Sequence, residues 1–273
     1  MSNASTVLIR GGGDLASGVA IRLHRVGIRV LIAELAQPLA VRRTVSFSEA
    51  VYEGQHTIEG VKSKLIDLDQ VSEWNEADTI PVIVDPEASI LLSVDIPVVI
   101  DARLLKQPPE ALARSVPLHI GLGPGFYAGR DCDAVIETRR SHALGRVYWA
   151  GSTQEDSGEP EGDPRRVLRA SHQGVITGLV KIGIHVEESQ PIDKIVSAEN
   201  NLHSIIHSPL AGVVRGLMRD GSRVLKGLKI GDVDARNDPA ACFLVSDKSL
   251  AIGGGALEAI LTRPEIRKKI LPG

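Results

Sequence analysis

The chain has 273 residues and a formal net charge of −3, with 31 lysines and arginines against 34 aspartates and glutamates. Its composition is 43% hydrophobic and only 3% aromatic. Without a basic surplus or stacking aromatics, the sequence excludes a nucleic-acid-binding protein, and its length favours two domains. No apolar run reaches the roughly 18 residues of a membrane-spanning helix, and residues 1–6 do not resemble a signal peptide. We therefore expect no membrane association.

The two cysteines, Cys132 and Cys242, do not form a CxxC pair. This pattern excludes a disulfide framework and suits a reducing compartment, so we expect a cytoplasmic protein. The histidines are scattered along the chain, and the sequence predicts no metal site. Asp131 and Asp133 flank Cys132 and are expected to raise the pKa of its thiol, which favours a structural cysteine over a nucleophile.

Six short apolar runs over residues 1–150 predict the strands of a parallel sheet. Near-continuous apolar runs are typical of strands that are covered on both faces. After the first run, Leu15, Val19, Leu23 and Val26 form one helical stripe. The alternation predicts an α/β fold with a doubly wound parallel sheet. The runs are Val7–Ile9, Val30–Ile32, Val82–Val84, Val98–Ile100, Leu118–Ile120 and Ala134–Ile136.

The first apolar run leads directly into a glycine-rich loop. Gly11-x-Gly13-x-x-Ala16 fits the dinucleotide-binding fingerprint, between a predicted strand and a predicted helix as that motif requires. Glu34 follows Gly13 by 21 residues, where an acid accepts hydrogen bonds from ribose hydroxyls. This part of the predicted cofactor site comprises Gly11, Gly12, Gly13, Asp14, Leu15 and Glu34.

A simpler interpretation of the same loop stays open. Asp14 places a carboxylate at the helix start, where its charge opposes a phosphate. In the alternative, the glycines form a tight turn and Asp14 caps the helix.

Three acids, Asp85, Asp101 and Glu137, directly follow other apolar runs. Because ligands of open parallel sheets bind beyond the carboxyl ends of the strands, we expect these acids at that edge, together with Glu34. Asp85 joins the predicted site, although Asp85 and Asp101 also fit the start of a helix.

A second glycine-rich loop follows the fifth run. Exposed amides with little side-chain bulk suit an anionic or planar ligand, and a plain connection rarely needs so many glycines. Gly121, Gly123 and Gly125 therefore complete the predicted site.

The composition divides the rest of the chain. Residues 151–164 hold five acids and no large aliphatic side chain, which predicts a linker or exposed loop. Residues 165–236 contain a repeat at an offset of 38, with seven identities between 174–195 and 212–233, and predict a small pseudo-twofold β domain. Residues 237–273 form a C-terminal helical segment, with helical spacing from Asp247 to Lys269.

Six segments, spread over nearly the whole chain, carry a resemblance to a known family: Leu8–Gly27, Gln37–Gly54, Gly121–Phe126, Val135–Arg139, Gly231–Arg236 and Ser246–Lys248. They resemble the YqeB family of accessory proteins, which are associated with selenium-dependent molybdenum hydroxylases and described as distant relatives of the XdhC/CoxF maturation factors. The resemblance implies a Rossmann-like domain over residues 1–150. It also implies a molybdopterin nucleotide as the alternative to an NAD-like dinucleotide, and a molybdenum hydroxylase or other maturation proteins as partners; self-association into a homo-oligomer is left open.

The second domain resembles the barrel-sandwich hybrids of biotinyl and lipoyl carriers, through Ser208–Gly212 and Asp220–Gly227. Such carriers present a modifiable lysine between their two halves, whereas residues 198–204 of this chain contain none. We therefore expect no covalent biotin or lipoate, and any ligand is expected to bind non-covalently.

Two functions are consistent with these features. The first is a maturation factor that binds a nucleotide or a molybdenum-cofactor-related ligand in an N-terminal crevice. The alternative is an NAD(P)-dependent oxidoreductase, for which His119 and Tyr127 are the only nearby acid–base candidates. No catalytic residue is assigned.

Overall fold

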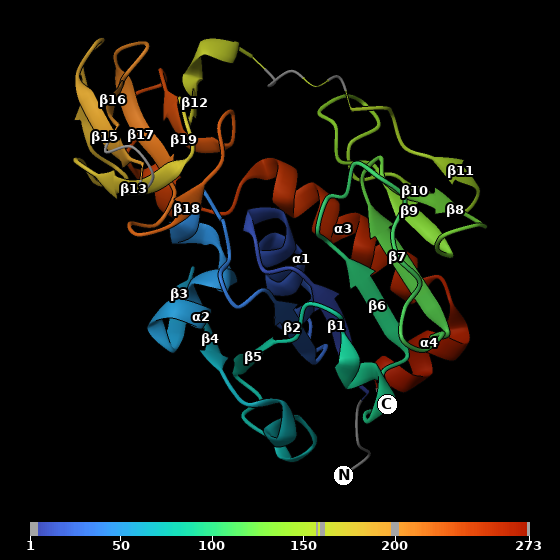
Figure 1. The fold of residues 1–273 in the computed structure, drawn as a ribbon. Coiled ribbons are helices and arrows are strands. Elements are labelled where there is room, and N and C mark those ends of the chain that lie inside the picture. The colour runs from blue at the N-terminus through green and yellow to red at the C-terminus, as the bar shows by residue number, and fades with distance from the viewer. Residues whose placement is uncertain (1–4, 157, 159–161, 198–201, 272–273) are drawn as a thin grey trace. The chain divides into compact units, whose positions relative to one another are not determined.

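Figure 1 shows the computed structural model, which describes residues 5–156, 158, 162–197 and 202–271. The chain forms two compact units. Unit 1 comprises residues 1–38, 46–157 and 245–273, and unit 2 comprises residues 39–45 and 158–244. The C-terminal segment therefore returns to the unit that contains the N-terminus.

Unit 1 is built on a nine-stranded sheet with the strand order β10-β9-β7-β6-β1-β2-β5-β4-β3. The six apolar runs predicted from the sequence are all strands of this sheet. The strands are β1 (Val7–Arg10), β2 (Val30–Glu34), β3 (Gln55–Ile58), β4 (Val61–Leu65), β5 (Thr79–Val84), β6 (Val98–Asp101), β7 (Leu118–Leu122), β9 (Ala134–Ile136) and β10 (Val147–Tyr148); a separate two-stranded sheet joins β8 (Tyr127–Ala128) and β11 (Gly151–Ser152).

The sheet is mixed, which corrects the predicted wholly parallel arrangement. The strands from β9 to β4 are parallel, but β3 and β10 pair antiparallel with their neighbours. At one edge, Glu59 and Gly60 both have positive φ, as a two-residue hairpin turn requires. A hairpin reverses the chain, so β3 and β4 cannot be parallel.

The prediction of a doubly wound sheet, with helices on both faces, is also wrong. The helices α1 (Asp14–Arg25) and α3 (Asp247–Leu261) pack against each other, with Gly18 at the contact, where a Cβ would come within 2.5 Å of Ser249 Cβ. Alternate strand residues, Leu8, Leu31 and Val99 among them, instead face a cluster of loop and 3-10 residues from 88 to 96. The remaining helices are α2 (Ala50–Glu53), α4 (Pro264–Ile270) and the 3-10 helices η1 (Arg43–Val45), η2 (Phe47–Glu49), η3 (Leu68–Glu73), η4 (Ser89–Leu92), η5 (Pro164–Arg166) and η6 (Ala240–Phe243).

The predicted C-terminal helical segment is two helices, because Pro264 occupies the first turn of α4 and starts a new helix after α3 ends. Within the described residues, one stretch, Ala240–Leu261, has the length and apolar composition of a membrane-crossing helix. Core helices meet the same criterion, and Ile252, Ala256, Ala259 and Ile260 of α3 are buried inside unit 1.

Unit 2 consists of two four-stranded antiparallel sheets, β12-β19-β17-β14 and β16-β15-β13-β18. The repeat of 38 residues corresponds to matched strands, since β13, β14 and β15 recur as β17, β18 and β19. The short middle strand of each half pairs with a strand of the other half: β14 pairs with β17, and β18 pairs with β13. The strands are β12 (Val167–Arg169), β13 (Gly174–Gly178), β14 (His185–Val186), β15 (Pro191–Val196), β16 (His203–His207), β17 (Gly212–Leu217), β18 (Arg223–Val224) and β19 (Lys229–Asp234).

The predicted combination of a Rossmann-like doubly wound sheet and a barrel-sandwich hybrid is therefore replaced by a nine-stranded mixed sheet and two four-stranded antiparallel sheets. Of the predicted linker, residues 157 and 159–161 lie outside the described part of the chain, as do residues 198–201 of the stretch between the repeats. The start of the linker is ordered: Gly151 and Ser152 form β11, and the Gln154 amide donates to Glu137 Oε2 over 2.8 Å.

Candidate functional site

The three glycines after β1 occupy three different environments. Gly11 has a φ of +90°, a left-handed conformation that favours glycine. A Cβ on Gly12 would lie 2.9 Å from the Ser48 backbone nitrogen, so this position is closely packed. Gly13 has an ordinary φ of −66°, and a Cβ there would meet no atom within 4 Å. The loop therefore needs glycine at Gly11 for conformation and at Gly12 for space, while Gly13 borders open space.

Gly13 is the N-cap of α1, and no side chain caps the helix there. The first intrahelical bond runs from the Ser17 amide to the Gly13 carbonyl over 2.8 Å. The amides of the first helical turn therefore have no partner within the helix, and the helix dipole makes this end attractive to anions. Asp14 is the first helical residue rather than the cap, so the alternative interpretation of Asp14 as a capping residue is wrong, while its carboxylate does lie in the first turn.

Glu34, at the end of β2, is tied to the loop. Its Oε2 accepts the Gly12 amide over 2.6 Å and its Oε1 accepts the Leu35 amide over 2.7 Å. Burial raises the pKa of the Glu34 carboxyl, and the two backbone hydrogen bonds oppose this rise. Glu34, predicted to accept a hydrogen bond from a ribose, therefore stabilises the loop. Each of its carboxylate oxygens keeps a second lone pair that can accept a further hydrogen bond.

Ser17 on α1 is a fixing residue that the sequence did not reveal. Its hydroxyl donates to the Gly12 carbonyl over 3.1 Å and accepts the Phe47 amide over 2.8 Å. The Ser48 amide also donates to the Gly12 carbonyl, over 2.9 Å. Ser17 is fully buried, but it lies about 200° around the helix from Leu15, on the side of α1 opposite the predicted apolar stripe. The stripe therefore gave no sign of its role.

The four acids expected at the carboxyl ends of the strands do lie there, and all are buried. Each accepts hydrogen bonds from the protein itself, which leaves them as anchors of their loops. Asp85 anchors the start of η4 by accepting the Ser89 and Ile90 amides, each over 2.9 Å. Glu137 accepts the Arg139 amide over 2.7 Å. The sequence therefore located these acids correctly, and the structure commits their oxygens to backbone amides and, for Asp101, to arginines.

Asp101 belongs to a charged network that extends from Arg10, the last residue of β1. The Arg10 guanidinium donates to Glu110 over 2.9 Å and lies 3.4 Å from Asp101. Arg103 pairs with Asp101 over 2.6 Å and with Glu110 over 2.5 Å. Burial works to raise the pKa of Glu110, but hydrogen bonds from Arg103 and Arg10 outweigh it and lower that pKa to about 2. The charges of the two arginines and the two acids thus balance. The sequence signal that could have predicted the role of Arg10 is an arginine at the end of an apolar strand.

The second glycine loop is explained by packing. A Cβ on Gly121 would collide with the ring of Phe126, and one on Gly125 would collide with the Leu105 carbonyl. Gly123 has a φ of +85° and lies against Thr138. Neighbouring atoms fill the space beside the Cα of Gly121 and of Gly125, which leaves no room for a ligand there. The structure therefore favours a packing role for these two glycines.

The acid–base candidates of the oxidoreductase alternative have contrasting environments. His119 is buried, its Nε2 has no hydrogen-bond partner, and its ring meets Phe126 edge-on with centroids 6.1 Å apart. Burial lowers the pKa of His119, and Asp101 and Asp133 oppose this effect. Tyr127 is 44% exposed.

Cys132 is buried, and this burial raises the pKa of its thiol to about 12, with Asp131 and Asp133 adding to the rise. The predicted direction is confirmed, and the larger cause is burial rather than the flanking charges. No group of three or more metal-ligating side chains occurs within residues 5–156, 158, 162–197 and 202–271.

A relative is similar to nearly the whole of this chain. The chain is 44% identical over 265 residues to the uncharacterized protein YqeB of Escherichia coli (strain K12). The chain is therefore similar to part of YqeB. The match covers 95% of this chain and 48% of the relative, so the YqeB-like chain spans about half the length of that protein. No family model matches the chain, and its likeness to XdhC/CoxF maturation factors stays a prediction.

Solved structures give weaker likenesses. They include the product-bound ectoine utilization protein EutE (DoeB) from Ruegeria pomeroyi (12% identity, TM-score 0.28, 84% of this chain and 85% of that chain). A succinylglutamatedesuccinylase/aspartoacylase from Rhodobacter sphaeroides matches at 12% identity and a TM-score of 0.31, over 86% of each chain. Scores this low assign neither fold nor function to this chain.

Proposed function

We propose that unit 1 binds a phosphate-bearing nucleotide at the amino end of α1, and that the YqeB-like protein uses it as an accessory factor of a molybdenum hydroxylase. The ligand is an NAD-like dinucleotide or a molybdopterin nucleotide, held without a covalent bond. The single observation that carries the binding proposal is the open space at Gly13 beside the uncapped start of α1. The resemblance to YqeB accessory proteins supplies the client class.

The surroundings of Gly13 support a nucleotide over a bare phosphate. Leu35 follows Glu34 directly and is 47% exposed, and Val84, which pairs with Glu34 across the sheet, is 43% exposed. Large apolar side chains at the ends of neighbouring strands offer a surface for a planar base. A sugar hydroxyl donated to a free lone pair of Glu34 would lie between that base and the phosphate.

The negative charge of Asp14 limits how tightly this site can bind a phosphate. Its carboxylate lies in the first turn of α1 and repels a phosphate that approaches the same amides. Affinity is therefore expected to be moderate and to depend on the charge of residue 14.

Isothermal titration calorimetry of the purified chain with NAD, NADP, CTP and a molybdopterin dinucleotide tests the proposal. We expect Gly13→Val to remain folded and to lose binding, because the side chain fills the space that the phosphate needs. Asp14→Asn is the matched control and is expected to bind more tightly. Absence of heat with all four ligands under reducing conditions, or unchanged affinity in both variants, contradicts the nucleotide site.

The client proposal needs a separate measurement. We expect co-expression with a molybdenum hydroxylase to raise the fraction of active hydroxylase, and Gly13→Val to remove this gain. A gain that persists in the Gly13→Val variant would separate client activation from nucleotide binding.

A further inference from the structure

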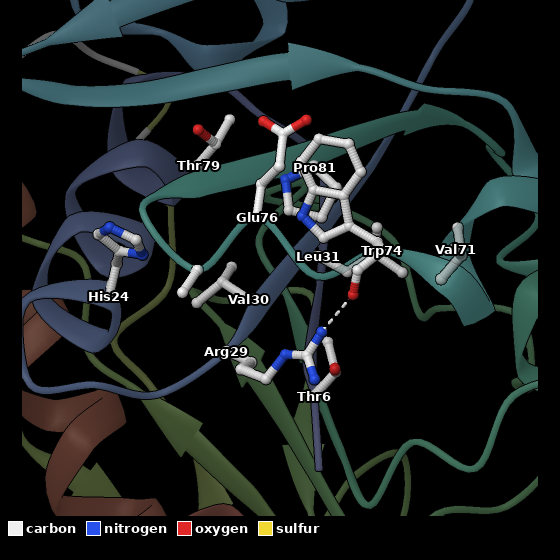
Figure 2. A pocket seen from close by; sticks show the side chains of 11 residues that line it. Thr6, His24, Arg29, Val30, Leu31, Val71, Trp74, Glu76, Thr79 and Pro81 are labelled. Carbon is white, nitrogen blue, oxygen red and sulfur yellow. Dashed lines mark hydrogen bonds between the residues drawn. The ribbon is translucent and has the colours of Figure 1, made fainter. Parts of the chain in front are cut away.

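A cavity lies at the other end of the strands of unit 1, where β1, β2 and β5 begin (Figure 2). Thr6 precedes β1, Arg29 precedes β2 and Thr79 opens β5. Because Gly13 follows the carboxyl end of β1, this cavity is separate from the site proposed above. Its volume is about 40 Å³.

The cavity contains a hydrogen-bond donor without an acceptor. The Nε1 atom of Trp74 is buried and has no hydrogen-bond partner. In Figure 2 the nitrogen edge of its indole ring faces the inside of the group of lining residues. Burying an N–H without an acceptor is unfavourable, so it marks a place where an acceptor atom is expected.

Arg29 adds a positive charge to the lining of the same cavity. Its guanidinium donates to the Trp74 carbonyl over 2.5 Å, and it forms no ion pair with a carboxylate in the described part of the chain. Glu76 also lines the cavity, but its carboxylate is paired with Lys64 over 3.0 Å. The Lys64 ammonium lies 5.3 Å from the Trp74 ring centroid as well. Among the lining residues, Arg29 therefore carries the charge that no ion pair within the described part of the chain balances.

The other groups add little charge. Burial lowers the pKa of His24, and Asp78 opposes this while Arg25 adds to it, so the imidazole is mainly neutral at pH 7. Thr6 and Thr79 bring hydroxyl groups, and Val30, Leu31 and Pro81 form the apolar part of the lining.

We propose that this cavity binds a small carboxylate anion. The Trp74 indole and the Arg29 guanidinium donate to the carboxylate oxygens, and a short aliphatic tail lies against the apolar lining. Because one water needs roughly 10–15 Å³ of such space, the cavity holds about three or four non-hydrogen atoms, the size of acetate. The planar guanidinium fork suits a carboxylate better than a single-point anion does.

The test observes the Trp74 N–H directly. The chain has two tryptophans, so Trp149→Phe leaves a single indole resonance in a ¹H–¹⁵N spectrum. Sodium acetate, titrated against sodium chloride at equal ionic strength, is expected to move this resonance saturably, and chloride is not. Arg29→Gln is expected to weaken acetate binding roughly tenfold or more, as loss of a charge-assisted hydrogen bond does.

Arg25→Gln is the matched control, because Arg25 on α1 is exposed and pairs with Glu59 over 3.1 Å rather than lining the cavity. It is expected to leave acetate binding unchanged. Where Arg29→Gln does not fold, Trp74→Phe decides: broadening of the ¹³C-acetate signal by the protein is expected to be lost in this variant. An indole resonance that does not move, a shift that chloride reproduces, or acetate binding that persists in the folded variants overturns the proposal. Nucleotide binding at Gly13 is a separate observation, so either site can fail without the other.

Discussion

Glu34 holds Gly12 in place across 22 residues of sequence, through a 2.6 Å hydrogen bond from the Gly12 amide to Glu34 Oε2. This one contact joins the loop after β1 to the end of β2. Burial of Glu34 raises the pKa of its carboxyl, and the hydrogen bond from Gly12 opposes this rise. The stability of the loop and the properties of the proposed nucleotide site are therefore linked.

Glu34→Gln is expected to destabilise the protein. A glutamine has one acceptor oxygen and would turn its NH₂ group toward one of the two backbone amides, so one buried N–H loses its acceptor. The expected loss is about 1–3 kcal/mol in the free energy of unfolding, measured by urea denaturation. Glu87→Gln, at an exposed position after β5, is the control and should have no effect. Equal stability of both variants would contradict the anchoring role of Glu34.

The glycines of the first loop are expected to respond differently to alanine. Gly12→Ala places a Cβ 2.9 Å from the Ser48 nitrogen and 3.2 Å from Glu34 Oε2, and should cost roughly 1–3 kcal/mol of unfolding free energy. Gly13→Ala has free space and an ordinary φ, and should cost no more than about 1 kcal/mol. Thermal denaturation of both variants measures the difference. A larger loss for Gly13→Ala would show that its surroundings are packed.

Asp193 in β15 is expected to make unit 2 less stable as the pH rises. Both carboxyl oxygens are buried without a hydrogen-bond partner. Burial and the nearby Asp220 raise the pKa of Asp193 to about 7, and Arg43 opposes this. Below the ordinary value of 3.8 the folded and unfolded states are both protonated at this residue. As the pH rises toward 7 only the unfolded chain releases the proton, so folding stability falls, by about 1.4 kcal/mol per unit of pKa difference.

Asp193→Asn removes this titration. The variant is expected to gain stability over the parent chain between about pH 4 and pH 7, and to keep that gain above pH 7. Urea denaturation at several pH values measures the gain. Asp69→Asn, at an exposed position, is the control and should track the parent. A gain that does not change with pH would exclude Asp193 as the titrating group.

Three consecutive glycines in α3 provide a further test. Gly254 is exposed, and a Cβ there meets no atom within 4 Å, so Gly254→Ala should stabilise the helix by roughly 0.5–1 kcal/mol. A Cβ on Gly255 would collide with the Gly145 carbonyl, and one on Gly253 would lie 2.8 Å from Arg22 Cγ. Both of these alanine variants should be destabilised, Gly255→Ala more strongly because backbone yields less than a flexible arginine. Melting temperatures of the three variants give the order.

The sequence by itself determined the local elements. Six apolar runs became strands because an unbroken run of β-branched and aliphatic residues is stable only when both of its faces are covered. The turn at Gly11 could be predicted in the same way, because its φ of +90° is a local property that favours glycine. The acids at the strand ends could be placed because a parallel sheet brings its carboxyl ends to one edge.

Only the tertiary structure decided what those residues contact. Glu34 accepts the Gly12 amide, Asp101 meets Arg10 across 91 residues, and Gly121 makes room for Phe126. The edge strand β3 is antiparallel because a short hairpin joins it to β4, and its place in the sheet follows only from this pairing. The spacing of apolar residues shows which side chains of a segment are buried. It carries no information on which residues, distant in sequence, bury them. Hydrogen-bond partners and close backbone approaches are set by such atoms, which is why the strands were predictable and their contacts were not.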